Sequence, residues 1–125
     1  RALDIVIHAS TEPEPFGLAV AEAMACGKAV IASSLGGPSE FVRDGIDGLI
    51  HTAGDPADLA RKIERLTGDV ALREQLGRES RETALRLFDR RRLAAEMIPV
   101  YERIRNSPKV SRADVFAIGA STIQD

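Results

Sequence analysis

Two glutamates near the start of the chain are its strongest candidates for chemistry. Glu14 and Glu22 are separated by seven residues in the stretch EPEPFGLAVAEAMACG. Pro15 disfavours the helical conformation at the residue before it, so we expect Glu14 in a loop and a helix that begins near Phe16 or Gly17. A carboxylate accepts hydrogen bonds from the vicinal hydroxyls of a sugar or a ribose. The spacing therefore predicts two acceptors for hydroxyl groups around the start of one helix.

The first turn of this helix offers a second means of recognition. The backbone N–H groups of Gly17, Leu18 and Ala19 have no acceptor inside the helix, and the helix dipole favours an anion beside them, so a phosphate is expected to fit there. Glu22 shares a helix face with Leu18 and Cys26 and is expected about one turn, roughly 6 Å, below these groups. Hydroxyl acceptors and an anion site together suit a nucleotide sugar.

Glu22 is also the only charged residue between Leu18 and Cys26. The helix is otherwise apolar and is expected to be buried, so this carboxylate should be paired, protonated or turned toward a ligand. A purely structural alternative remains open, in which an arginine neutralises Glu22 and Glu14 is a solvated loop residue.

The stretch resembles a known enzyme family. Its two glutamates, the PFG between them, the AMACG that follows and the apolar run that precedes are similar to the E-x7-E signature of retaining glycosyltransferases of family four, which have the GT-B fold. The resemblance extends from about Leu3 to about Arg105. It implies an α/β fold, namely part of a Rossmann-like parallel sheet flanked by helices, the C-terminal half of a GT-B donor domain.

The resemblance implies a role for each matched position. Glu14 would lie beside the donor sugar and be important for turnover, which makes it the catalytic candidate, and Glu22 would bind the ribose hydroxyls of the nucleotide. Such enzymes transfer a sugar from a nucleotide-diphosphate donor to an acceptor hydroxyl with retention, and no metal or other cofactor is implied. The backbone groups that would hold the sugar and the diphosphate belong to Phe16, Gly17, Leu18 and Ala19.

Three apolar runs are expected as the parallel strands that position these groups. They are residues 3–10, 28–33 and 49–51, and the first is expected to be buried on both faces. After the second run, Gly36 and Gly37 permit close backbone approach. The pair suits either a tight turn or a ligand-lining loop, and the family resemblance includes the pair and favours the loop.

Helical patterns fill the rest of the chain. A short helix is expected from Pro38 to near Asp44, and a capped helix from Asp55-Pro56 to Gly68. Helical segments follow from Asp69 to Phe88 and, with a kink at Pro99, from Arg90 to Ile104. We predict one partial nucleotide-sugar-binding domain over residues 1–105 and a tail of unknown structure over residues 106–125.

Composition limits the classes of partner. The 125 residues carry a net charge of −2, which gives no basic surface for nucleic acid. The only cysteine, Cys26, is expected to be a buried packing residue in a reducing, cytoplasmic compartment. No apolar run approaches the roughly 20 residues that span a bilayer, although peripheral membrane contact of the parent enzyme is allowed. His8 and His51 have no carboxylate nearby in the sequence pattern, so no metal site is expected.

The chain is expected to be a fragment that lacks the acceptor domain and the first half of the donor domain. The missing half would contain an Arg and Lys pair that neutralises the diphosphate, so the 125 residues alone are expected to have no transferase activity. The first strand is expected to have an unpaired edge that promotes self-association.

Three other functions remain open on the sequence. The chain could belong to a non-catalytic nucleotide-sugar-binding module or to another GT-B enzyme, an epimerase or a phosphorylase. An unrelated flavodoxin-like interaction domain would explain the strands and helices but gives no reason for Glu22. The acceptor, the donor base and the donor sugar cannot be named from these residues.

Overall fold

The computed structural model describes residues 2–107 of the chain. It divides into two units, one that ends at Asp89 and one that begins at Arg90 with helix α5 (Arg90–Asn106). Most of the sequence-predicted tail, from residue 108 onward, lies outside the described residues. None of the helices within residues 2–107 combines the length and the apolar character that crossing a bilayer requires.

The first unit is built on a parallel three-stranded sheet. Its strands β1 (Ile5–Ile7), β2 (Ala29–Ser33) and β3 (Leu49–His51) lie in the order β1-β2-β3. All five residues of β2 are buried, as a central parallel strand requires. The prediction that the first strand is buried on both faces was wrong. β1 lies at the edge of the sheet with β2 as its only partner among the described strands, and Ile7 is 43% exposed.

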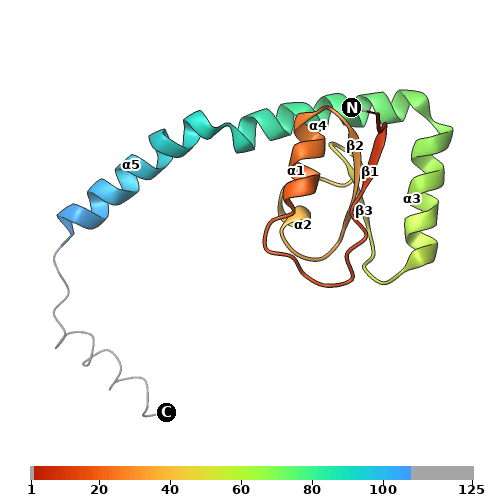
Figure 1. Ribbon diagram of the computed structural model, residues 1–125, viewed down its shortest axis with the longest axis horizontal. Helices are drawn as coiled ribbons and strands as arrows, with labels where there is room; N and C mark the ends of the chain where they lie inside the picture. Colours follow the sequence, from red (N-terminus) through yellow and green to blue (C-terminus); the bar gives the residue numbers. More distant parts are fainter. Residues whose placement is uncertain (1, 108–125) are drawn as a thin grey trace, which may run out of the picture. The chain divides into compact units, whose positions relative to one another are not determined.

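Helices cover both faces of this sheet. Figure 1 shows α1 (Leu18–Ala25) and α3 (Pro56–Gly68) on opposite sides, and α4 (Val70–Phe88) crossing the end at which the strands begin. The short helix α2 (Pro38–Phe41) lies near the start of α1. The predicted α/β architecture, a parallel sheet flanked by helices, is confirmed.

Side chains that alternate along β2 divide the core into two clusters. Val30 and Ala32 pack with Val20 and Met24 of α1, whereas Ile31 and Ala29 pack toward the other face. The second cluster is completed by Leu49, Leu66 and Leu76, from β3, α3 and α4. Because α4 contributes to both clusters, it ties the two layers together.

The predicted helix boundaries are largely confirmed. The Asp55 side chain accepts the N–H groups of Ala57 and Asp58 at the start of α3, and Asp69 accepts that of Leu72 at the start of α4. The helix expected to run to Asp44 ends at Phe41, because the N–H of Arg43 donates to the Asp47 carboxylate (2.6 Å) instead of to a helical carbonyl.

The exposed edge of β1 gives a prediction about solution behaviour. We expect the 125-residue chain to dimerise or aggregate through this edge, and Ile7→Lys to reduce the association because an edge lysine opposes strand pairing. Light scattering of both proteins at matched concentrations measures the effect. A monodisperse wild-type monomer would rule the edge out as an association site.

Candidate functional site

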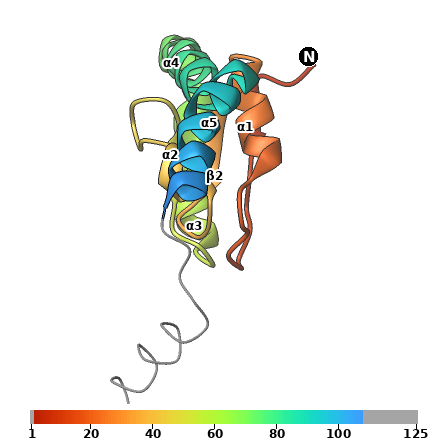
Figure 2. The same cartoon turned by 90° about the vertical axis from the view of Figure 1, so that its left-hand side faces the viewer.

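The loop that carries Glu14 leaves the sheet at the carboxyl end of β1. Figure 2 shows the chain running beyond the strand end and turning back into α1. Gly17 caps the helix in the left-handed conformation (φ 87°), which confirms the predicted helix start. A Cβ at this position would lie 2.3 Å from Pro38 Cγ and 2.9 Å from Glu14 Oε1. The loop therefore requires glycine here, and the Glu14 carboxylate lies beside the helix start.

The N-terminal turn of α1 keeps its free backbone donors. The N–H groups of Val20 and Ala21 donate to the Gly17 carbonyl at 3.0 and 3.1 Å, and no side chain caps the helix. Within residues 2–107, the N–H groups of Leu18 and Ala19 have no hydrogen-bond acceptor. Such donors, with the positive end of the helix dipole, can hold an anionic oxygen.

The glycine pair after β2 lies in direct contact with this loop. The Gly37 N–H donates to the Glu14 carbonyl at 2.8 Å. A Cβ on Gly36 would lie 2.5 Å from the backbone N and O of Glu14, and one on Gly37 would lie 2.5 Å from Phe16 Cα. The two loops therefore pack backbone against backbone at the carboxyl edge of the sheet, a contact that the sequence pattern alone did not predict.

An aromatic cluster holds the end of the Glu14 loop, just before α1. The ring of Phe16 lies 5.7 Å from that of Phe41 and 5.5 Å from that of Phe88, centroid to centroid, and Phe41 and Phe88 are 5.1 Å apart. These rings come from the loop, α2 and the end of α4. Sequence reasoning assigned only the backbone of Phe16 to the site and missed this role of its side chain.

The structure corrects two predictions about α1. The helix is buried on one face only, through Val20, Ala21, Ala23 and Met24, because the sheet and α4 cover a single side of it. The face that carries Leu18, Glu22 and Cys26 is exposed, with Leu18 63% exposed. The prediction that Cys26 is a buried packing residue was therefore wrong.

Glu22 lies in a pocket on this open side of α1. The pocket has a volume of about 240 Å³ and is mainly apolar, and its other lining residues are Leu3, Val6, Ala19, Ala23, Cys26 and Lys28. Glu22 itself is exposed, and among residues 2–107 no ion pair joins it to an arginine. Glu14 does not line this pocket, so the pocket does not bring the two glutamates together.

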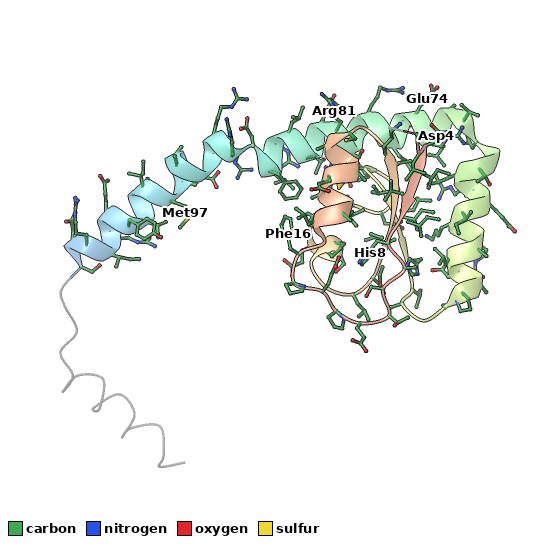
Figure 3. The ribbon with its side chains drawn as sticks, in the orientation of Figure 1. Asp4, His8, Phe16, Glu74, Arg81 and Met97 are labelled. Carbon is green, nitrogen blue, oxygen red and sulfur yellow. The ribbon has the colours of Figure 1, made fainter. Side chains whose placement is uncertain are left out.

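His8 lies against Glu14, a contact that the sequence pattern did not indicate. Its Nε2 is 2.8 Å from Glu14 Oε1, although five residues separate the two along the chain. In Figure 3, His8 lies at the end of β1 away from α4. No group of three metal-binding side chains gathers anywhere in residues 2–107.

Comparison with known proteins decides the family. The family described as "Glycosyl transferases group 1" matches residues 1–83. The chain belongs to this family. The resemblance derived from the E-x7-E stretch is thereby confirmed, and the parallel sheet with its helices is that of a GT-B glycosyltransferase.

Curated relatives of this group 1 glycosyltransferase chain share more than a third of the aligned residues. A D-inositol 3-phosphate glycosyltransferase of Streptomyces bingchenggensis is 38% identical over 112 residues, which are 85% of this chain and 24% of the relative. An alpha-maltose-1-phosphate synthase of Mycobacterium tuberculosis is 36% identical over 97 residues, which are 73% of this chain and 25% of the relative. The chain thus spans about a quarter of the length of these relatives.

Solved structures show the same fold. HepE of Anabaena in complex with UDP superposes with a TM-score of 0.78 and 34% identity, over 81% of this chain and 28% of that one. Sucrose-phosphate synthase of Thermosynechococcus elongatus gives a TM-score of 0.76 and 37% identity, over 82% of this chain and 26% of that one.

In this glycosyltransferase domain, most of the sequence-predicted site residues come together. The Glu14 carboxylate, the free N–H groups of Leu18 and Ala19 and the two loops form one surface at the carboxyl edge of the sheet, where open α/β sheets bind ligands. Glu22 lies in the pocket on the open side of α1, which Ala19 also lines and Glu14 does not.

Proposed function

We propose that the protein to which this chain belongs transfers a sugar, with retention, from a nucleotide-diphosphate donor to an acceptor hydroxyl, and that this chain binds the donor. One observation carries the proposal. The Glu14 carboxylate lies beside the uncapped start of α1, so a hydroxyl acceptor and free N–H donors face the same surface. The similar HepE structure holds UDP, which supports a nucleotide donor.

The roles follow from the chemistry of each group. Glu14 would accept hydrogen bonds from the donor sugar and help to stabilise the positive charge that develops on it during transfer. The N–H groups of Leu18 and Ala19 would bind diphosphate oxygens, which the dipole of α1 favours. Glu22 would accept the ribose hydroxyls.

The remaining predicted site residues would shape this surface. Gly36 and Gly37 would line it as part of the loop that packs against Glu14, and the backbone of Phe16 and Gly17 leads the chain into α1. The single cysteine of the chain fits a cytoplasmic location, which we also propose. The 125 residues alone are expected to show no transfer, since they span about a quarter of their relatives' length.

Donor titration of the full-length protein tests this proposal. UDP, GDP and ADP sugars are titrated by calorimetry into the wild type and Glu22→Ala, and one nucleotide should bind best. The substitution should weaken that donor by about 1–3 kcal/mol, because the ribose hydroxyls lose a charged acceptor.

The matched control is Glu64→Ala, which removes an exposed helical glutamate from α3 on the far face of the sheet. It should leave donor affinity unchanged. If Glu22→Ala binds every donor as the wild type does, Glu22 is structural. If the wild type binds a donor without transferring or hydrolysing it, the non-catalytic module is the better description.

A further inference from the structure

His8 is a polar side chain in direct contact with Glu14. Its Nε2 lies 2.8 Å from Glu14 Oε1, and the side chains of His8 and Glu14 are 15% and 37% exposed. Neither the sequence pattern nor the family signature assigns His8 a role. A contact of this length with a proposed catalytic carboxylate gives His8 a means of acting on the site.

The sheet holds the backbone of His8 from two strands. Its N–H donates to the Ile31 carbonyl of β2 at 2.8 Å. Its carbonyl lies 3.2 Å from Nε2 of His51, a buried residue that ends β3 and whose Nδ1 lies 3.0 Å from the Thr52 carbonyl. The His51 side chain thus reaches over the end of β2 to β1. The backbone of His8 is therefore held in place by the sheet, whereas Glu14 belongs to a loop.

The contact between the two side chains leaves both of them partly unsatisfied. Nε2 and Oε1 are close, but their alignment does not make a hydrogen bond, and Glu14 Oε1 is buried without a hydrogen-bond partner among the described residues. The Nδ1 atom of His8 is also buried without a partner there. Because a buried polar atom without a partner is costly, a hydrogen bond from Nε2–H to Oε1 is favoured at this distance.

We infer that His8 is a positioning residue that fixes the Glu14 carboxylate for the donor sugar. An Nε2–H that donates to Oε1 would satisfy this oxygen and leave the second carboxylate oxygen for a sugar hydroxyl. A second titratable side chain, that of His51, also meets residue 8, at its backbone carbonyl. This inference rests on the proposed function, in which Glu14 binds the donor sugar.

Two amide substitutions distinguish the roles of the two ring nitrogens of His8. The amide nitrogen of His8→Gln takes the place of Nε2 and can donate to Glu14, whereas that of His8→Asn takes the place of Nδ1, which has no partner. In the full-length protein, His8→Asn should lower kcat by about 10- to 100-fold, the cost of a displaced reacting group, with donor affinity changed less than about threefold. His8→Gln should retain most of the activity.

The outcomes decide between explanations. Equal activity of the two variants, whether high or low, overturns the inference, and thermal unfolding of both shows whether a low value reflects lost stability. Glu14→Gln in the His8→Asn background should cost less than it does alone, because the two residues act as a unit. If Glu14 and Glu22 variants leave transfer and donor binding unchanged, the proposed function itself has failed. If the Glu14 and Glu22 substitutions lower transfer or donor binding but the His8 substitutions have no effect, this inference alone has failed.

Discussion

Replacing Gly36 by alanine is expected to destabilise the protein by about 2–5 kcal/mol and to displace the loop that carries Glu14. Gly36 has a φ of 76°, a conformation that costs an L residue about 1–2 kcal/mol. The added Cβ would lie 2.5 Å from the backbone N and O of Glu14, which cannot rotate away, and such overpacking costs a further 1–3 kcal/mol or so. Urea unfolding measures the loss, and donor titration measures the effect on the site.

Gly54→Ala is the matched control for this experiment. Gly54 has the same φ of 76°, but nothing lies within 4 Å of the Cβ it would acquire. The Gly54→Ala variant should lose only about 1–2 kcal/mol of unfolding free energy, from the strained backbone conformation, and should keep its donor affinity. Equal losses in the two variants would show that backbone conformation, and not the contact between the loops, makes glycine necessary at position 36.

Asp47→Ala is expected to be the most damaging substitution away from the site, at about 3–5 kcal/mol. Asp47 is fully buried and accepts hydrogen bonds from the backbone N–H and the side chain of Arg43, both at 2.6 Å, and from the Thr83 hydroxyl at 2.9 Å. The half-exposed Arg43 side chain can return to water. The Thr83 hydroxyl is buried and loses this acceptor, which weakens the connection between the turn after α2 and α4.

Chemical denaturation of Asp47→Ala tests this expectation, and Arg61→Ala provides the comparison. Arg61 pairs with Asp58 at 3.0 Å on the surface of α3, and its side chain is 63% exposed. Removal of such an exposed pair should cost less than about 1 kcal/mol. Should Asp47→Ala cost no more than Arg61→Ala, the buried carboxylate would contribute little, and the turn after α2 would be held by its backbone.

Local signals in the sequence predicted much of this fold. Some features depend only on a few neighbouring residues, and the structure confirms them. They are the caps at Asp55 and Asp69, the glycine before α1 and the apolar run of β2. The contact of Glu14 with the glycine pair could not be predicted in this way. It depends on how two loops some 20 residues apart meet at one edge of the sheet.

The wrong predictions share a physical cause. Burial of Cys26 and of β1 was inferred from apolar composition, but burial depends on which surfaces the neighbouring elements cover, and α1 is covered on one face. The approach of His8 to Glu14 depends on side-chain conformations at the end of a strand, which residue spacing does not encode. The aromatic cluster joins Phe16, Phe41 and Phe88, too far apart for any periodic pattern.

The backbone contact between the two loops has a consequence for protein engineering. Since Gly36 and Gly37 touch Glu14 and Phe16 with no side chain between them, neither loop can gain bulk or change length without moving its neighbour. Libraries that seek a new donor should therefore randomise residues 11–17 and 34–38 together as one cassette. Beneficial changes found in one loop alone should transfer poorly between homologues, because their effects are not additive.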